Sequence, residues 1–178
     1  MEKKYELTEE TLEIDGHVLN RIIALRDFGE VKKGDLGGFI EKESNLAHDR
    51  NCWIYNDAAV RDDAMVYGEA IVYGKAEVCG EAKVYGKAKV YGEARVYGEA
   101  KVYGEAIIKS KSDYIVFKNW WSSGRYFTWT RSNDMWGVGC FYGTGEELIK
   151  KAYNDSDESG REYERIVKYV ESIKSEIK

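Results

Sequence analysis

The chain has 178 residues, a formal net charge of −5 and no proline. That length fits one or two small domains, each with a buried core. No segment is basic, which argues against nonspecific nucleic-acid binding, because phosphate neutralisation dominates the affinity of that class of protein. The sequence shows no signal peptide and no apolar run long enough to cross a bilayer, so we expect a cytoplasmic protein that binds neither nucleic acid nor membrane.

The cysteines give no sign of a metal site or a disulfide framework. Cys52, Cys79 and Cys140 lie far apart in the sequence and form no Cys-x-x-Cys pair. That spacing excludes a zinc ribbon and fits a reducing compartment. We therefore expect free thiols.

Residues 1–50 are predicted to form an N-terminal cap. Asp15 and Gly16 separate two apolar-rich stretches, which is a strong signal for a tight β-hairpin. A glycine-rich segment, residues 34–40, follows. It lacks both the G-x-G-x-x-G and the Walker spacing. We interpret it as turns that lead into the next element, with phosphate binding as the less favoured alternative.

Residues 51–110 are dominated by a six-residue repeat. An aliphatic residue stands at every sixth position from Ile54 to Ile108, and an alanine follows four residues after each but the last. A short, strict period indicates a solenoid, whose units are stable only when stacked on their neighbours. The third position of the repeat is Asn56, then Asp62, then glycine throughout. These residue types tolerate a positive φ, so we expect a turn at each one.

This pattern resembles the hexapeptide-repeat, left-handed β-helix superfamily. The resemblance implies three repeats in each triangular coil, and parallel strands stacked about 4.8 Å apart. The fold class we expect is mainly β: a single-stranded left-handed parallel β-helix between an N-terminal hairpin cap and a small C-terminal β3α2 cap. Cys52 continues the alanine column backwards and His48 falls in the aliphatic column, which predicts a frayed first coil there.

With three repeats in each coil, tyrosines align in columns on the outer faces. On two of the three faces, the charged residues at the fourth repeat position alternate in sign from one coil to the next, as neighbouring strands require. One tyrosine column is predicted to contact a protein partner: Tyr55, Tyr73 and Tyr91. A second column is predicted to mediate self-assembly into a trimer or dimer, because exposed apolar columns mark association sites: Tyr67, Ile71, Tyr85, Tyr103 and Ile107.

Residues 111–178 are predicted to form an α+β cap. The stretches 114–118, 125–131 and 135–142 alternate with period two, as strands do, and turn residues separate them. Two helices follow, each opened by a capping box, the first from Thr144 to Glu147 and the second from Ser159 to Glu162.

Tryptophans are concentrated in this C-terminal cap. Tryptophan fills small cores, and it is also enriched in binding hot spots. Trp120 and Trp121 are adjacent, so we expect one of the two to face outward. The candidate partner-binding residues in the cap are Trp120, Trp121 and Trp136.

The superfamily resemblance also implies chemistry. Many members are acyltransferases with a histidine general base, and γ-class carbonic anhydrases hold zinc on three histidines. This chain has only His17 and His48. His48 is a weak candidate for a catalytic base and is mainly expected to be structural, whereas His17 is expected to be exposed after the hairpin turn. Two histidines do not match a three-histidine zinc site, so we expect no metal and no cofactor.

The segments 21–28 and 34–40 resemble uncharacterised hexapeptide-repeat proteins of bacteria, phages and prophages. That resemblance implies a bacterial or phage setting, including host cytoplasm. Our sequence-based interpretation is a non-catalytic scaffold that blocks a host or defence-system protein, with a basic partner surface to suit the acidic chain. The alternatives are an acyl-CoA-dependent acyltransferase and a protein that sequesters a small molecule such as a nucleotide, stacked on Trp120 or Trp136.

Overall fold

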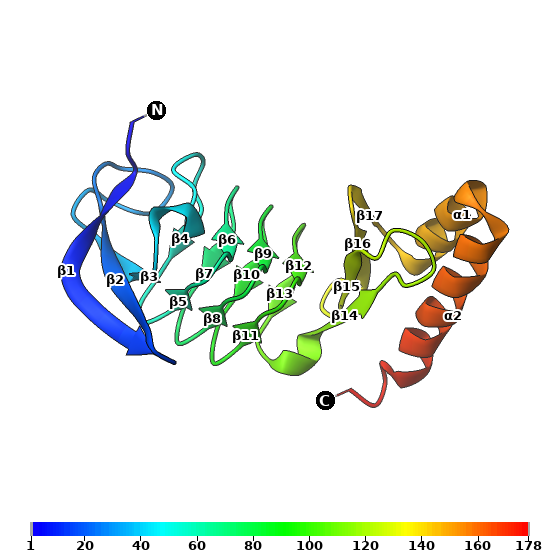
Figure 1. The fold of residues 1–178 in the computed structure, drawn as a ribbon. Helices are drawn as coiled ribbons and strands as arrows, with labels where there is room; N and C mark the ends of the chain where they lie inside the picture. Colours follow the sequence, from blue (N-terminus) through cyan, green and yellow to red (C-terminus); the bar gives the residue numbers. More distant parts are fainter. Residues whose placement is uncertain (1, 178) are drawn as a thin grey trace. The chain divides into compact units, whose positions relative to one another are not determined.

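The computed structural model describes residues 2–177. It consists of two compact units, Met1–Lys111 and Ser112–Lys178, which are described separately. The first unit holds strands β1 to β13, and the second holds β14 to β17 with helices α1 and α2 (Figure 1). Among the described residues, no helix is long and apolar enough to cross a membrane.

The N-terminal strands form the predicted hairpin. Strands β1 (Tyr5–Ile14) and β2 (His17–Ala24) pair in antiparallel fashion. Asp15 and Gly16 join them with φ values of 52° and 84°, which is the left-handed geometry of a tight hairpin turn. Strand β3 (Leu36–Ile40) pairs with β2 on one side and with the solenoid strand β5 on the other. The hairpin therefore continues a sheet of the solenoid.

The glycine-rich segment begins with the predicted turn, at Gly34 with a φ of 92°, but its residues 36–40 form the strand β3. A Cβ added to Gly37 would lie 2.5 Å from Cγ1 of Ile22, and one added to Gly38 would lie 2.4 Å from the carbonyl oxygen of Ala58. These glycines are required because other elements pack directly against the backbone of β3. Close packing, and neither a turn nor a phosphate cradle, accounts for them.

The repeats form ten short parallel strands on three sides of a coil. Three sheets result, with strand orders β13-β10-β7-β4, β12-β9-β6 and, continuing from β3, β5-β8-β11. Each residue pairs with the one three repeats later, as Ile54 does with Val72. This register confirms the predicted left-handed parallel β-helix. The strands are β4 (Trp53–Ile54), β5 (Ala59–Val60), β6 (Met65–Val66), β7 (Ile71–Val72), β8 (Glu77–Val78), β9 (Lys83–Val84), β10 (Lys89–Val90), β11 (Arg95–Val96), β12 (Lys101–Val102) and β13 (Ile107–Ile108).

The aliphatic and alanine columns form the core of the solenoid. Every aliphatic position from Ile54 to Ile108 is 0% exposed, and so is every alanine of the second column. Burial of each valine or isoleucine contributes roughly 1.5–3 kcal/mol, so this column supplies most of the stability. The corners have the expected positive φ, which is 56° at Asn56 and 69° at Gly86.

The first coil departs from the predicted register. Leu46 bridges to Val66, and Ile40 pairs with Val60. In each pair the sequence separation is two residues larger than the separation between paired residues in the regular repeats. Leu46, at 1% exposure, therefore occupies the inward column in place of His48. His48 lies in the longer corner that follows the short helix η1 (Glu43–Asn45).

The sheet of the C-terminal unit has one strand more than predicted. Strands β14 (Tyr114–Lys118), β15 (Tyr126–Thr130), β16 (Met135–Val138) and β17 (Phe141–Gly143) form an antiparallel sheet in chain order. The stretch predicted as a single strand over 135–142 is interrupted at Gly139, whose φ is 60°. This left-handed residue turns the chain back on itself. The short helix η2 (Lys111–Asp113) precedes β14.

One of the two predicted helix starts is confirmed. Helix α1 (Gly145–Asp155) begins with the capping box of Thr144 and Glu147. Helix α2 (Asp157–Ile173) begins three residues earlier than predicted, because the Ser156 hydroxyl accepts a hydrogen bond from the Ser159 N–H at 3.1 Å. Ser156 is therefore the cap, and Ser159 lies inside the first turn.

Candidate functional site

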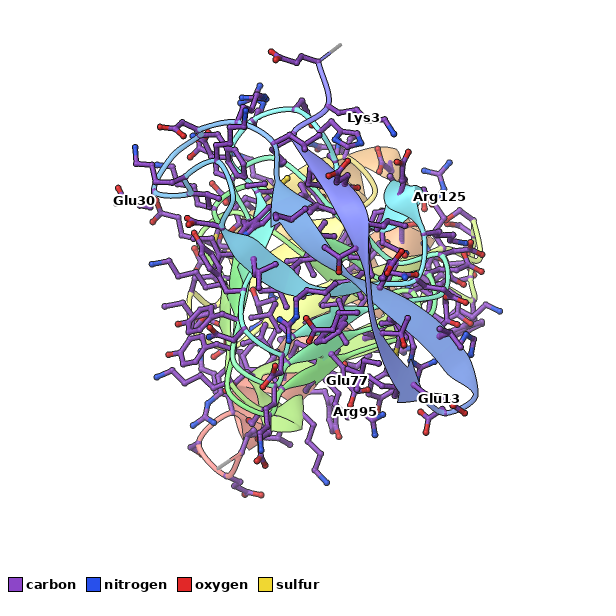
Figure 2. The ribbon with its side chains drawn as sticks, turned by 90° about the vertical axis from the view of Figure 1, so that its left-hand side faces the viewer. Lys3, Glu13, Glu30, Glu77, Arg95 and Arg125 are labelled. Carbon is purple, nitrogen blue, oxygen red and sulfur yellow. The ribbon has the colours of Figure 1, made fainter. Side chains whose placement is uncertain are left out.

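A network of charged side chains lies where the β1–β2 hairpin tip meets the sheet β5-β8-β11. We call it the hairpin-tip network. Figure 2 shows two of its members, Glu77 and Arg95, which form an ion pair of 2.7 Å. The members come from both strand ends and coil corners: Asp15, His17, Glu41, Arg61, Asp62, Glu77 and Arg95.

His17 lies between two carboxylates in this network. Its Nδ1 is 2.9 Å from Oε1 of Glu41, and its Nε2 is 3.5 Å from Oδ1 of Asp62. His17 is the first residue of β2, Glu41 directly follows β3, and Asp62 follows β5 in a corner with φ of 58°. All three side chains are partly exposed, at 35%, 29% and 28%, so solvent or a ligand reaches the group.

The two carboxylates are held in place by donors on their other oxygens. Oε2 of Glu41 accepts the backbone N–H of Asp62 at 2.6 Å. Oδ2 of Asp62 accepts the backbone N–H of Gly80 at 2.9 Å and an Arg61 guanidinium N–H at 3.1 Å. The hydrogen bond from His17, followed by that from Asp62, lowers the pKa of Glu41. Glu41 is therefore an ionised carboxylate that fixes the orientation of the imidazole.

Further ion pairs extend the hairpin-tip network along the sheet β5-β8-β11. Arg61 Nη2 lies 2.9 Å from Oδ2 of Asp15, and Arg95 Nη2 lies 3.7 Å from the same oxygen. Together, the four carboxylates and two guanidinium groups leave a net charge of −2 when His17 is neutral. The network therefore favours a cationic group near its centre.

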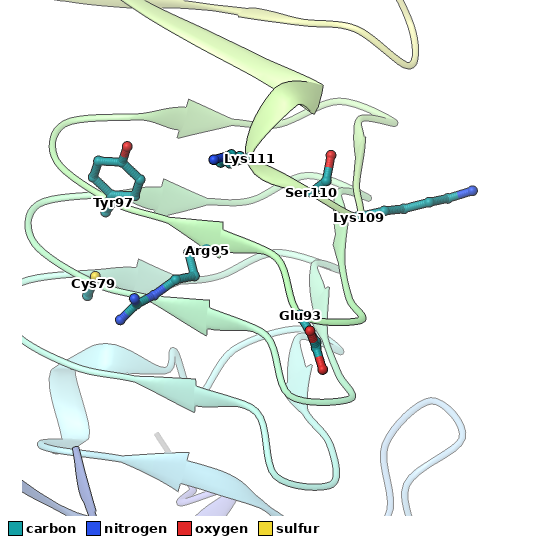
Figure 3. Close-up of a pocket in the computed structure, with 7 residues that line it drawn as sticks. All are labelled: Cys79, Glu93, Arg95, Tyr97, Lys109, Ser110 and Lys111. Atoms are coloured by element: carbon teal, nitrogen blue, oxygen red, sulfur yellow. The ribbon is translucent and has the colours of Figure 1, made fainter. Parts of the chain in front are cut away.

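Arg95 also borders a hollow of about 770 Å³ in the solenoid unit. Figure 3 shows Cys79, Arg95 and Tyr97 together, with Glu93 and Lys109 further along. A volume of this size is within the range of small-molecule sites. Burial raises the pKa of the Cys79 thiol, which disfavours a nucleophilic thiolate. The lining residues are Cys79, Glu93, Arg95, Tyr97, Lys109, Ser110 and Lys111.

The contacts of His48 fit a structural role. Its Nδ1 accepts the backbone N–H of Lys4 at 3.2 Å, and its ring stacks on Tyr5 with centroids 4.3 Å apart. Burial is the main cause that lowers its pKa, so the ring is held in the neutral form. Since Nδ1 is already an acceptor, the proton of the neutral ring lies on Nε2. Neither nitrogen then has a free lone pair for a substrate proton.

The tryptophans divide between core and surface. Trp120 is 71% exposed, as expected for one of the adjacent pair. Trp121 is half-buried, and its ring meets Tyr163 edge-on at 4.9 Å. Trp136 is only 2% exposed and lies in the core of the C-terminal unit. It is therefore unavailable for the predicted partner contact or for stacking a nucleotide, because its ring fills the interior.

The tyrosine columns are stacked as the register requires. In the second column, the ring centroids of Tyr67 and Tyr85 are 4.7 Å apart, and those of Tyr85 and Tyr103 are 4.5 Å apart. In the first column, Tyr73 and Tyr91 are 4.7 Å apart. Tyr55 is half-buried, as are Ile71 and Ile107. The roles of these residues in self-assembly or partner binding remain predictions.

Sequence reasoning did not bring His17, Glu41 and Asp62 together. Asp62 was identified only as a corner residue, and His17 only as an exposed residue after the turn. The missing information was the pairing of Ile40 with Val60, which places Glu41 beside Asp62. The one available signal was an acidic residue, Asp62, at a corner where most repeats have glycine.

Comparison with known proteins bears on the function of this fold. No protein-family model matches the chain. The chain is 41% identical over 66 residues to YdcK of Escherichia coli (strain K12), which is described as an uncharacterized acetyltransferase. The match covers 33% of this chain and 20% of the relative, so the chain spans about a fifth of the length of the curated protein it matches.

This similarity overturns our prediction of a non-catalytic scaffold that blocks a host or defence-system protein. The relative is named for acetyl transfer, which favours the acyltransferase alternative, and nothing in the match points to a phage or to an inhibitor. The parallel solenoid and the partial match are together consistent with the hexapeptide-repeat superfamily.

Proposed function

We propose that the chain transfers an acyl group from an acyl-CoA thioester to an amine or hydroxyl acceptor, with His17 as the general base. The observation that carries this proposal is the pairing of His17 Nδ1 with Glu41 at 2.9 Å. A base whose far nitrogen is held by a carboxylate presents its other nitrogen in a fixed direction, which is the arrangement general-base catalysis needs. The partial similarity to an acetyltransferase supports the same reaction class.

The geometry suggests a role for each group. The acceptor nitrogen or oxygen attacks the thioester carbonyl carbon, and Nε2 of His17 takes its proton. The tetrahedral intermediate then collapses with cleavage of the C–S bond, and the departing CoA thiolate takes the proton back from the imidazolium to leave as the thiol. Glu41 stabilises the imidazolium through the hydrogen bond from Nδ1–H. Asp62 Oδ1, 3.5 Å from Nε2, can accept a second hydrogen from an amine acceptor. A positioned base of this kind contributes about 10²–10⁴-fold to the rate.

The geometry favours His17 over His48 as the base. Nδ1 of His48 accepts a backbone N–H, whereas Nδ1 of His17 donates to a carboxylate. Only the second arrangement leaves Nε2 able to receive a proton from a substrate. His17 is also partly exposed, at 35% of its side chain.

The experiment is turnover of acetyl-CoA with a panel of amine and hydroxyl acceptors, followed by the release of free thiol. We expect turnover by the wild type and a loss of about 100-fold or more in His17→Asn. Glu105→Gln is the control, because Glu105 lies on another face with its side chain 80% exposed. Full activity of His17→Asn, or no turnover by the folded wild type with any acceptor, would contradict the proposal.

We also propose that the second tyrosine column mediates self-assembly. Its three rings form one continuous stack along the sheet β12-β9-β6. The prediction that Ile71 and Ile107 share this face is wrong, because they lie on β7 and β13 of the sheet that carries the first column, with Lys89 between them. A continuous stack of partly exposed aromatic rings is suited to burial against a second copy.

A further inference from the structure

His17 and the carboxylates beside it are also side chains of the types that bind metal ions. The sequence did not predict a metal site. His17, Glu41 and Asp62 each offer one ligand atom, and these atoms lie within 4.8 Å of one another. We propose that these three residues bind a divalent transition-metal ion of the zinc class. This inference is independent of acyl transfer and is tested by metal binding alone.

The spacing of one pair of ligand atoms, Nε2 of His17 and Oδ1 of Asp62, is close to that at a bound zinc ion. Zinc lies about 2.0–2.2 Å from imidazole nitrogen and carboxylate oxygen, so two ligands in a tetrahedral site are about 3.4 Å apart. His17 Nε2 and Asp62 Oδ1 are already 3.5 Å apart. Oε1 of Glu41 lies 2.9 Å from the other ring nitrogen, Nδ1, so Glu41 reaches an ion on Nε2 only when its side chain turns away from Nδ1.

Outer contacts orient both carboxylates for this role. The backbone N–H groups of Asp62 and Gly80 bind Oε2 of Glu41 and Oδ2 of Asp62, respectively. Of the remaining oxygens, Oδ1 of Asp62 is turned toward Nε2 of His17, and Oε1 of Glu41 is turned toward Nδ1. Hydrogen bonds that fix ligand orientation in this way are typical of metal sites and strengthen them.

Charge and ligand type indicate which ion fits. The hairpin-tip network has a net charge of −2 with neutral His17, which attracts a cation, although Arg61 donates to Oδ2 of Asp62 at 3.1 Å and offsets part of that charge. Magnesium and calcium take oxygen ligands, whereas an imidazole nitrogen favours zinc, cobalt or nickel. One nitrogen with two carboxylates therefore favours a transition metal.

A metal ion and a catalytic base would compete for His17. An ion bound to Nε2 occupies the lone pair that a base needs, so zinc would inhibit acyl transfer at this site. The two proposals can still fail separately. Metal binding is measured without any substrate, and acyl transfer is measured on protein stripped of metal.

The test uses the full chain without an affinity tag, after treatment with a chelator. Zinc is titrated by calorimetry, and cobalt by its visible absorption bands. We expect one ion per chain. His17→Ala and Asp62→Asn should each weaken binding by more than about tenfold. Asparagine is tolerated at this corner, since Asn56 has a similar φ of 56°.

Asp15→Asn is the matched control. It removes one negative charge from the same network, but Asp15 is not among the three ligands. Its zinc affinity should stay within a few-fold of the wild type. The proposal is overturned if the folded wild type binds no zinc, if His17→Ala binds it equally well, or if magnesium binds as tightly as zinc. Circular dichroism confirms the fold of each variant.

Discussion

Two faces of the solenoid have the same backbone but different side chains at the same repeat position. After β6, β9 and β12 this position is Tyr67, Tyr85 and Tyr103, which stack into a ladder. After β5, β8 and β11 it is Arg61, Cys79 and Tyr97, and a charged network with a hollow lies there instead. The comparison shows that the repeat determines the backbone scaffold, whereas departures from the repeat determine where charged side chains gather.

The largest effect is expected from a charge in the core that both faces share. Val84 is 0% exposed, so Val84→Asp buries a carboxylate without a partner. Such a group costs several kcal/mol, and we expect the solenoid to unfold. Lys87→Glu is the control, because Lys87 lies on the surface and its ion pair with Glu105 is long, at 3.9 Å. Thermal unfolding followed by circular dichroism measures both, and a folded Val84→Asp solenoid would refute the assigned core.

The proposed role of the second tyrosine column is tested by measuring self-assembly. Tyr85 is the central ring of the ladder, with a neighbour on each side. We expect Tyr85→Lys to reduce the oligomer to a monomer in light scattering, because the lysine interrupts the stack of aromatic rings and adds a charge to it. Tyr91→Lys on the other column should leave the mass unchanged. A wild type that stays strictly monomeric at high concentration would rule out this role.

Two glycines with the same backbone conformation test how much the stacking of the coil corners contributes to stability. Gly86 and Gly98 have φ values of 69° and 66°. A Cβ on Gly86 would lie 2.9 Å from the backbone nitrogen of Gly104, whereas one on Gly98 meets nothing within 4 Å. An alanine at positive φ costs about 1–2 kcal/mol. Urea unfolding should show that cost for Gly98→Ala and a larger one for Gly86→Ala, and equal costs would show that stacking of the corners is unimportant.

The charged face has a smaller, pH-dependent effect on stability. The pKa of Glu41 is lowered in the folded state, first by His17 and then by the Asp62 N–H. Its contribution is therefore present above the ordinary glutamate pKa of about 4.3 and is lost as the pH falls through the lowered value. Glu41→Gln removes this contribution. Urea unfolding at neutral and acid pH should show a difference between wild type and variant that shrinks below about pH 4, and a constant difference would contradict the assignment.

Most of the solenoid was predictable because its pairing follows directly from the repeat. The alignment of Ile54 with Val72 needs only the six-residue period and the three repeats per coil that the superfamily resemblance implies. The N-terminal coil has no such period, and its pairings span two additional residues, so the contact between Glu41 and Asp62 could not be inferred. In the C-terminal unit, pattern alone did not distinguish buried Trp136 from exposed Trp120, since both are large apolar residues near strand ends.

The central claim is that His17, and not His48, serves as the base for acyl transfer on the charged face. The most direct measurement is kcat/KM for acetyl-CoA turnover in His17→Asn and His48→Gln side by side, with the melting temperature of each variant. We predict a loss of about 100-fold or more in His17→Asn and near wild-type turnover in the folded fraction of His48→Gln. The opposite order, or equal turnover in both variants, would contradict the account.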